Sequence, residues 1–299
     1  MLISHHGLFL KLMNRGVPLC FLLIVIYWYL NMEYCCRWGD ALSDFFRVLC
    51  GTKQGGILSP EFFAIYIDDL IKELRESKVG CHILGVFIAA ILFADDMTLL
   101  SPTRSAMQRL LEICDNYCRK FCLKFNIGKT KTMLFGKLSS SIDSLAELTL
   151  RGIPIGFVEK YRYLGFHVVS GRSFTFSSTE SLRGFFGAVN SIMTLLTRPP
   201  ENVLMQLLYT TCVPKLTYGA AVLDLTASEK HRYNVAVNNA IRAIFKFRYW
   251  QSIRQLREFF HYDPIEVIFA KARKRFLLSI KEHRNGVLRF LSTLVVENA

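Results

Sequence analysis

The sequence predicts an α+β protein in two parts, with short antiparallel strands and helices up to residue 170 and helices from residue 171 onward. Three observations lead to this prediction. Short apolar runs separated by turn residues are typical of strands and hairpins and fill the first part. A polar, Ser-rich stretch from Ser170 to Ser178 marks the boundary. After Thr179 the apolar residues recur at helical spacing.

The stretch Val86–Leu100 organises the first part. Uncharged, mostly apolar residues lead into Asp95 and Asp96, a second apolar run follows, and Ser101-Pro102 ends it. Two such runs around a polar pair predict a hairpin of buried strands with both carboxylates at its tip. Adjacent anions beside a core are costly without a cation, and Mg²⁺ is the hard cation that such carboxylates bind.

The remaining elements follow from periodicity and helix-start signals. Ser59-Pro60-Glu61 predicts a helix start with Ser59 as the cap, and an apolar face then runs to Leu74. Further helices are predicted over 103–122, 180–196, 202–212, 229–247, 253–260 and 265–283, and short strands over 44–49, 123–126, 133–136, 148–158 and 161–169. Residues 138–144 read as a Ser-rich loop.

A second acidic pair, Asp68-Asp69, follows an aromatic residue just as Asp95-Asp96 does. Its apolar surroundings have a helical period, and charged residues follow within two turns. We therefore interpret it as part of a solvated helix face and not as a metal site.

The run Val17–Leu30 contains no charged residue and imitates a membrane anchor, but it is shorter than the ~20 residues that span a bilayer. We favour a buried helix over a membrane segment and expect no membrane partner. Nine cysteines scattered through apolar runs favour an intracellular protein, nuclear or cytoplasmic, with reduced thiols. Cys114, Cys118 and Cys122 repeat every four residues, and we favour core packing over a metal stripe.

The formal net charge of +13 is concentrated after residue 180, where 17 Lys and Arg residues face 8 Asp and Glu residues. An excess of this kind favours a polyanion partner such as nucleic acid. The alternative is an ordinary basic surface.

Four motifs occur in a definite order: Gly51–Pro60, Phe93–Asp96, Phe125–Lys131 and Tyr163-Leu164-Gly165. This order resembles the reverse transcriptase of non-LTR, LINE-like retrotransposons. The motifs are similar to its Gln-Gly motif, its metal-binding aromatic-Ala-Asp-Asp box, the following lysine motif and its primer-grip hairpin. The resemblance implies a partial polymerase palm over residues 1–170 and an α-helical, basic thumb with a C-terminal segment over residues 171–299.

The same resemblance implies an RNA-directed DNA polymerase that joins deoxynucleoside triphosphates to a DNA primer on an RNA template, using two Mg²⁺ ions. It assigns both metals to Asp95 and Asp96. Lys129 is expected to neutralise or protonate the leaving group, the alternative being an ordinary turn lysine. Gln54 is expected to contact nucleotide or template, the alternative being an amide that stabilises the turn.

Three further residues join this expected site. Gly55 and Gly56 permit close backbone approach to nucleotide or template, and Phe93 lies beside the acidic pair. The family also has a third catalytic aspartate on a strand shortly before a segment like His6–Leu12, whereas residues 1–5 contain no Asp or Glu. From this we expect a truncated palm without fingers and first catalytic strand, inactive by itself. The alternative is a non-catalytic nucleic-acid-binding remnant.

Overall fold

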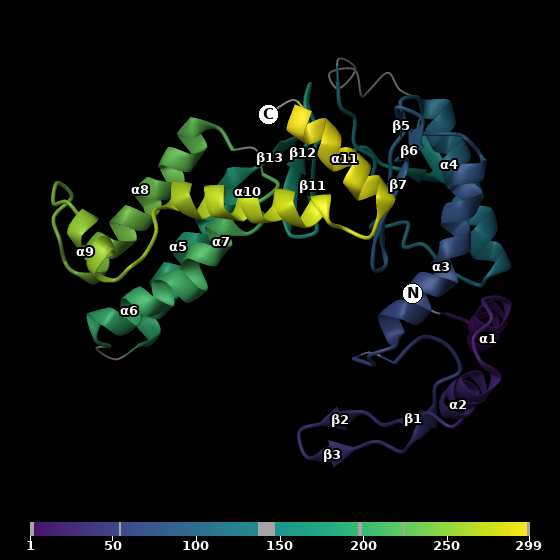
Figure 1. The fold of residues 1–299 in the computed structure, drawn as a ribbon. Coiled ribbons are helices and arrows are strands. Elements are labelled where there is room, and N and C mark those ends of the chain that lie inside the picture. Colours follow the sequence, from purple (N-terminus) through teal and green to yellow (C-terminus); the bar gives the residue numbers. More distant parts are fainter. Residues whose placement is uncertain (1–2, 54, 137–146, 197–198, 224, 298–299) are drawn as a thin grey trace. The chain divides into compact units, whose positions relative to one another are not determined.

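The computed structural model describes residues 3–53, 55–136, 147–196, 199–223 and 225–297. They divide into two units (Figure 1). The first comprises the described parts of Met1–Leu134 and Ser140–Val158, and the second those of Phe135–Ser139 and Glu159–Ala299. Both units combine helices with small antiparallel sheets, which confirms the predicted α+β class. The boundary at residue 170 stays a prediction.

Among the described residues, the first unit contains four helices and a set of short hairpins. Its helices are α1 (His5–Asn14), α2 (Leu19–Leu30), α3 (Ser59–Glu76) and α4 (Arg104–Lys120). Its strands are β1 (Glu33–Tyr34), β2 (Arg37–Trp38), β3 (Ala41–Leu42), β4 (Phe46–Arg47), β5 (His82–Ile83), β6 (Val86–Phe87), β7 (Ala90–Phe93), β8 (Asp96–Leu99), β9 (Leu148–Leu150) and β10 (Ile153–Ile155). Every strand pair in this unit is antiparallel, with the orders β1-β4, β2-β3, β5-β6, β7-β8 and β9-β10.

The core of this unit lies among α1, α3 and α4. Leu12, Leu70 and Leu110, one from each helix, are fully buried there, because each helix directs its apolar stripe toward this shared core. Cys114 and Cys118 belong to this core, as predicted, and burial raises the pKa of the Cys114 thiol to about 12.

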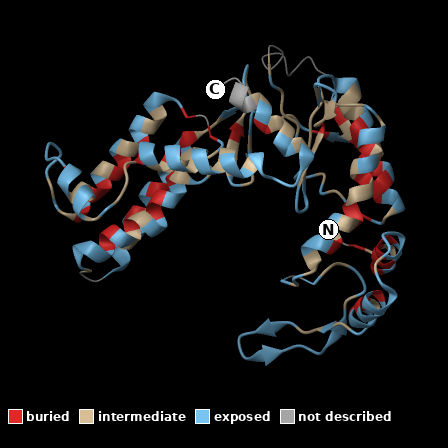
Figure 2. Cartoon of the chain, in the orientation of Figure 1, coloured by how far each residue is buried: buried red, intermediate tan, exposed pale blue. Residues whose placement is uncertain are grey.

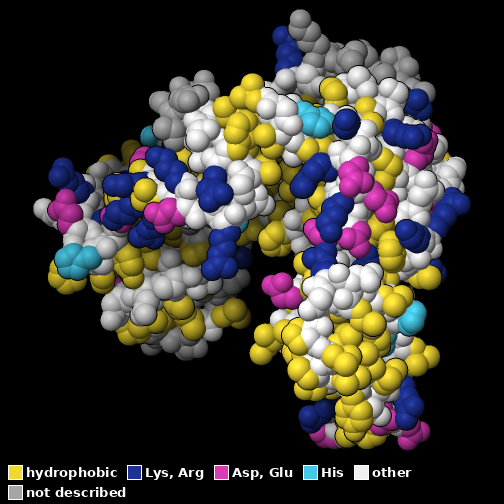
Figure 3. Space-filling model, turned by 45° about the vertical axis from the view of Figure 1, so that its right-hand side comes forward, with side chains coloured by type: hydrophobic (Ala, Val, Ile, Leu, Met, Phe, Trp, Pro, Cys, Tyr) yellow, Lys and Arg dark blue, Asp and Glu magenta, His cyan; other side chains and the backbone are white. Residues whose placement is uncertain are grey.

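Helix α2 corrects one expectation. It forms within the predicted segment, but only Leu22, Val25 and Tyr29 are buried, whereas most of its other apolar side chains are exposed (Figure 2). Hydrophobic side chains accordingly gather on the lower part of the first unit in Figure 3. Among the described residues no helix combines the length and the hydropathy needed to cross a bilayer.

Two further expectations were wrong. Cys122 lies past the end of α4 with φ +54° and is exposed, so the third cysteine does not join the core. The segments 123–126 and 133–136 form no strands; Thr132 and Phe135 make isolated bridges with Phe157 and Gly171. The predicted loop at residues 138–144 lies outside the described residues.

The second unit begins with a three-stranded antiparallel sheet, β11-β12-β13, and continues with helices. The strands are β11 (Lys160–Tyr163), β12 (Phe166–Val169) and β13 (Thr175–Phe176). The helices are α5 (Ser178–Leu195), α6 (Glu201–Leu207), a π-helical turn (Leu208–Cys212), α7 (Val213–Thr217), α8 (Ala227–Ile244), α9 (Arg254–Phe259), α10 (Ile265–Lys281) and α11 (Gly286–Glu297).

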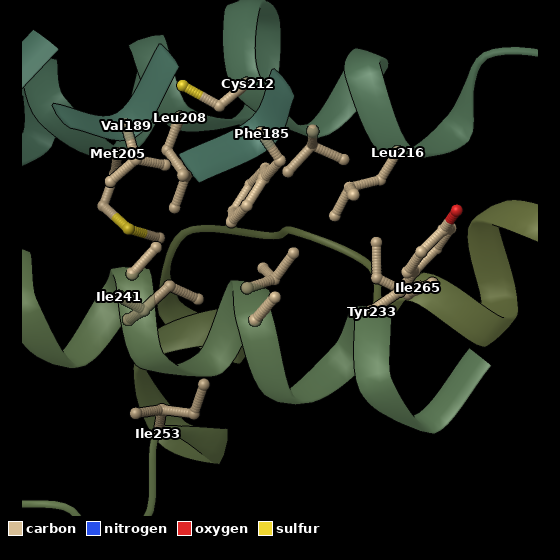
Figure 4. Packing of buried hydrophobic residues seen from close by; sticks show 14 of the residues in the cluster. Phe185, Val189, Met205, Leu208, Cys212, Leu216, Tyr233, Ile241, Ile253 and Ile265 are labelled. Atoms are coloured by element: carbon tan, nitrogen blue, oxygen red, sulfur yellow. The ribbon is translucent and has the colours of Figure 1, made fainter. Parts of the chain in front are cut away.

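The core of the second unit forms where α5, α6 and α7 face α8 (Figure 4). Phe185 of α5 and Met205 of α6 point toward Ile241 of α8, and all three are fully buried. Helix α8 starts with a capping box in which Thr226 and Glu229 satisfy each other's backbone N–H groups. The local cap of α8 and its packing in the shared apolar core therefore both favour this helix.

Candidate catalytic and nucleotide-binding site

The strands β7 and β8 form the predicted hairpin. Phe93 pairs with Asp96, so Ala94 and Asp95 form a two-residue turn between them. Ala94 has φ +51°, a left-handed conformation that is uncommon for a residue with a side chain. Asp95 in the turn and Asp96 at the start of β8 thus bring both carboxylates to the tip, as predicted.

The two faces of this hairpin differ, and here the prediction of buried strands was wrong. Leu92 and Met97 pack against the core of the first unit, whereas Ile91 and Phe93 on the opposite face are 48% and 62% exposed. Side chains alternate between the faces of a strand, so one covered face leaves the other open. Asp95 and Asp96 are both exposed.

A glycine holds the base of the hairpin close to helix α4. Gly80 has φ +100°, and a Cβ at that position would lie 2.4 Å from Cβ of Ala89 and 3.1 Å from a methyl carbon of Leu110. The backbone of Cys81 donates to Leu100 O at 3.1 Å. A side chain at position 80 would therefore clash with Ala89 and Leu110. The chain bends at Ala89, so the predicted continuous strand divides into β6 and β7.

Electrostatic surroundings separate the two acidic pairs. Asp69 forms an ion pair with Lys11, and Asp68 forms one with Arg15 at 2.6 Å; Lys72 contacts both carboxylates. Burial raises the pKa of each of these carboxyls, but the hydrogen bonds and charges of the cations outweigh it and lower both pKa values. The helix face of Asp68 and Asp69, which we expected to be solvated, therefore carries ion pairs.

Asp95 and Asp96 have the opposite surroundings. No hydrogen bond or ion pair engages either carboxylate within the part of the chain that the structure describes. An exposed anionic pair without a protein cation retains its full capacity to bind a metal ion. The carboxylates of Asp68 and Asp69, by contrast, are already paired with cations of the protein.

Lys129 lies in the turn that the sequence predicted. Its backbone N–H donates to the carbonyl of Asn126 at 3.1 Å, and the hydroxyl of Thr130 donates to the same carbonyl at 2.9 Å. Asn126 therefore shapes the turn by local hydrogen bonds, which is a common role of asparagine. The side chain of Lys129 is exposed.

The Gly55-Gly56 loop is closed by short contacts. Gly56 donates to the carbonyl of Lys53 at 3.0 Å, and the hydroxyl of Ser59 donates to the same carbonyl at 2.5 Å. A Cβ on Gly56 would lie 2.7 Å from Oγ of Ser59, so only glycine fits there, while Gly55 has φ +77° and open space around it. Ser59 thus braces the loop instead of capping α3, whose cap residue is Leu58. Gln54 lies outside the described residues.

The segments around the Gly55-Gly56 loop, the Asp95-Asp96 turn and the Lys129 turn pack against shared apolar clusters. Leu58 after the glycine loop, Met97 of β8 and Phe125 before the lysine turn all pack against the core of the first unit. Leu99 and Ile127 pack against a smaller cluster that contains Leu111. The segments that carry the predicted glycine, aspartate and lysine motifs therefore pack against the same core of the first unit, which their separation in sequence does not reveal.

The oxygen ligands at the hairpin tip fit the preference of Mg²⁺. They are only two, however: in the described ranges no three His, Cys, Asp or Glu side chains come together as a metal-binding group. Asp40 and Asp44 lie beside the β2–β3 hairpin and are exposed. The donor chemistry at the hairpin tip therefore matches a divalent metal.

The fourth motif, Tyr163-Leu164-Gly165, lies at the β11–β12 turn in the second unit. Tyr218, just after α7, donates from its hydroxyl to Leu164 O at 2.9 Å and stacks on Phe166 at 4.8 Å. The sequence did not point to this role of Tyr218. The tyrosine is the contact that fixes the turn to the helices of its unit.

The part of the chain that contains the hairpin matches a known protein family. A family model described as reverse transcriptase (RNA-dependent DNA polymerase) matches residues 2–168, more than half of the chain. The chain therefore belongs to the reverse transcriptase family.

Its relatives are retrotransposon proteins. The retrovirus-related Pol polyprotein from type-1 retrotransposable element R2 of Popillia japonica is 27% identical over 203 residues, which cover 65% of this chain and 32% of that protein. The corresponding protein from type-2 element R2DM of Drosophila melanogaster is 34% identical over 91 residues, or 30% of this chain and 8% of that protein. The protein from type-1 element R1 of Bradysia coprophila is 26% identical over 185 residues, or 58% and 17%. These matches confirm the LINE-like resemblance, and the chain spans about a third or less of each relative.

Proposed function

We propose that this chain is the reverse transcriptase part of a retrotransposon protein, in which Asp95 and Asp96 bind Mg²⁺ during nucleotidyl transfer. The substrates are deoxynucleoside triphosphates, a DNA primer and an RNA template. The observation that carries the proposal is the β7–β8 turn, which exposes both carboxylates, neither of them in an ion pair with a described residue.

Each motif has a distinct task in this proposal. Asp95 and Asp96 hold the metal, which stabilises negative charge on the reacting phosphate. The Gly55-Gly56 loop offers backbone groups to nucleotide or template at a place where Gly56 has no space for a side chain. Lys129 supplies a positive charge for the leaving pyrophosphate from an exposed turn.

We further propose that residues 1–299 by themselves do not extend a primer. Two carboxylates form the ligand set among the described residues, and a two-metal site with a missing ligand loses stabilisation of the developing charge. A primer-extension assay on an RNA template with Mg²⁺ tests this, beside the variant Asp95→Ala. Equal incorporation supports the proposal, and incorporation above that variant overturns it.

Metal binding is tested separately from catalysis. Titration with Mn²⁺, followed by its electron paramagnetic resonance signal, should show binding that weakens by about tenfold or more, roughly 1.4 kcal/mol, in Asp95→Asn/Asp96→Asn. The matched control is Asp40→Asn/Asp44→Asn, which removes two exposed carboxylates in the same unit. Equal loss in both double variants would mean non-specific binding to surface charge.

A second candidate function is non-catalytic binding of nucleic acid, favoured by the basic residues after residue 180, where 17 Lys and Arg face 8 Asp and Glu. It predicts RNA binding that weakens steeply with salt and does not need Mg²⁺. Fluorescence anisotropy of labelled RNA at low and high salt measures this. Absence of binding at low salt would remove this candidate. An intracellular location accompanies both candidates, since nine cysteines are free among the described residues.

A further inference from the structure

The connection between α8 and α9 exposes two large aromatic rings at neighbouring positions. Tyr249 is 81% exposed and Trp250 is 61% exposed, although both side chains belong to residues that usually bury most of their surface. The rings contact each other edge to face, with centroids 4.8 Å apart and planes at 88°. The connection lies at one end of the second unit (Figure 1).

Hydrogen bonds fix the turn that carries these rings. Gln251 N–H donates to the carbonyl of Arg248 at 3.1 Å, and Arg248 N–H donates to the side-chain oxygen of Gln251 at 2.6 Å. Arg242 of α8 donates from Nε to Gln251 O at 3.2 Å. Tyr249 and Trp250 thus occupy the two corners of a turn closed from both sides and tied to a helix. A turn fixed in this way presents its rings without an ordering cost on binding.

The charge around the rings is positive. The guanidinium carbon of Arg248 lies 5.3 Å from the centroid of the Trp250 ring, and the exposed Lys246 precedes it by two residues. The acidic residue that follows most closely, Glu258, is paired with Arg254 at 2.9 Å. Flat rings combined with cations suit a ligand with planar apolar faces and negative charge, which is the chemistry of unpaired nucleotides.

We propose that the turn Arg248–Gln251 is a stacking site for unpaired nucleotides of a single-stranded RNA. The ring of Tyr249, as the more exposed one, takes the base, Trp250 buttresses it, and Arg248 and Lys246 meet the adjoining phosphates. The choice of RNA rests on the proposed function, but the site itself needs neither metal nor catalysis.

The test uses the full chain, a short fluorescent oligouridylate and anisotropy at low salt. Tyr249→Leu keeps an apolar side chain but loses the flat ring, so affinity should fall by about fivefold to a hundredfold. Tyr249→Phe should stay within about twofold of the unaltered chain, since it keeps the ring. Gln251→Ala should also weaken binding, because it loosens the turn without touching the rings.

Trp38→Ala is the matched control, since Trp38 is 88% exposed and follows an arginine but lies in the first unit. It should leave the affinity unchanged. In a Trp28→Phe/Trp38→Phe background Trp250 becomes the sole tryptophan, and oligouridylate should quench its fluorescence. Equal affinity of Tyr249→Leu and the unaltered chain, or no quenching, would overturn the proposal and leave a protein partner as the occupant. The binding should be the same with and without Mg²⁺, so failure here is distinguishable from failure of the metal site.

Discussion

The ammonium group of Lys11 on α1 is buried, and it forms an ion pair with the carboxylate of Asp69 on α3. It also donates to Oη of Tyr117 on α4 at 2.9 Å and lies 4.0 Å from the centre of the Phe121 ring. One cation therefore joins the three helices α1, α3 and α4. Asp69 belongs to the acidic pair Asp68-Asp69, which resembles Asp95-Asp96 in sequence alone.

The two partners of this ion pair should differ in their mutational cost. Asp69→Asn leaves a buried cation with a weaker partner and should destabilise α1 by about 2 kcal/mol, below the value for a fully buried pair because Asp69 is 39% exposed. Lys11→Met fills the same aromatic surroundings without a charge and should cost about 1 kcal/mol or less. Amide hydrogen exchange of α1 measures both. If Lys11→Met costs more than Asp69→Asn, the interactions of the ammonium group govern stability. The burial of an unpaired cation would then not be the main cost.

Acid should weaken the contact between α4 and the β9–β10 turn. Asp115 is buried and accepts hydrogen bonds from Arg151 and Arg119, each at 2.7 Å. Burial raises the pKa of this carboxyl, but the two arginines outweigh it and lower the pKa below its ordinary 3.8. The stabilisation is therefore present above about pH 4 and is lost as the pH falls through the lowered pKa of the folded state.

Circular dichroism as a function of pH measures this effect. Asp115→Asn should be less stable at pH 7 by about 2 kcal/mol and should lose the acid-dependent part of the transition. An unchanged acid profile in the variant would assign that transition to other carboxyls.

The same substitution at two neighbouring leucines of α2 should destabilise the protein to very different extents. Leu22 is 2% exposed and Leu23 is 55% exposed. Leu22→Ala should therefore cost about 2–5 kcal/mol, and Leu23→Ala about 0.5 kcal/mol or less. Hydrogen exchange of α2 amides compares the two variants. Similar costs would indicate that a further contact covers the exposed face in solution.

Gly165 and Gly152 provide a matched pair of turn glycines. Both have positive φ, at +86° and +72°, but a Cβ on Gly165 would lie 2.9 Å from the Tyr218 ring, whereas Gly152 has open space. Gly152→Ala should cost about 1 kcal/mol from backbone strain alone, and Gly165→Ala about 1–2 kcal/mol more. Exchange of the amides in β9–β10 and β11–β12 measures each cost locally. Equal costs would mean that Tyr218 moves aside without loss.

Much of the site could be read from local pattern. The hairpin around Asp95 was predictable because apolar runs, a polar pair and a breaker all lie within one short stretch. The lysine turn was predictable because Asn126 and Gly128 are turn residues whose hydrogen bonds are local. The strands predicted over 123–126 and 133–136 do not form, because a strand depends on partners elsewhere in the chain, and Thr132 makes a single bridge, to Phe157.

Exposure was less predictable than secondary structure. The apolar content of Val17–Leu30 indicated a helix but not which of its faces α1 and α3 would cover. The same holds for Cys122, whose spacing suggests a core position although α4 ends at Lys120. Periodicity describes a continuing helix, whereas burial depends on neighbours and on where the helix stops.

By itself, the sequence determined the α+β class, the hairpin that carries Asp95 and Asp96, and the family to which the ordered motifs belong. These features depend on spacing within short segments or on motif order along the chain. Only the tertiary structure decided that Asp68 and Asp69 are paired with Arg15 and Lys11, from the end of α1, whereas Asp95 and Asp96 form no ion pair with any described residue. The physical reason is that a charge is compensated by whatever the fold brings within a few ångströms, and those partners lie more than fifty residues away in sequence.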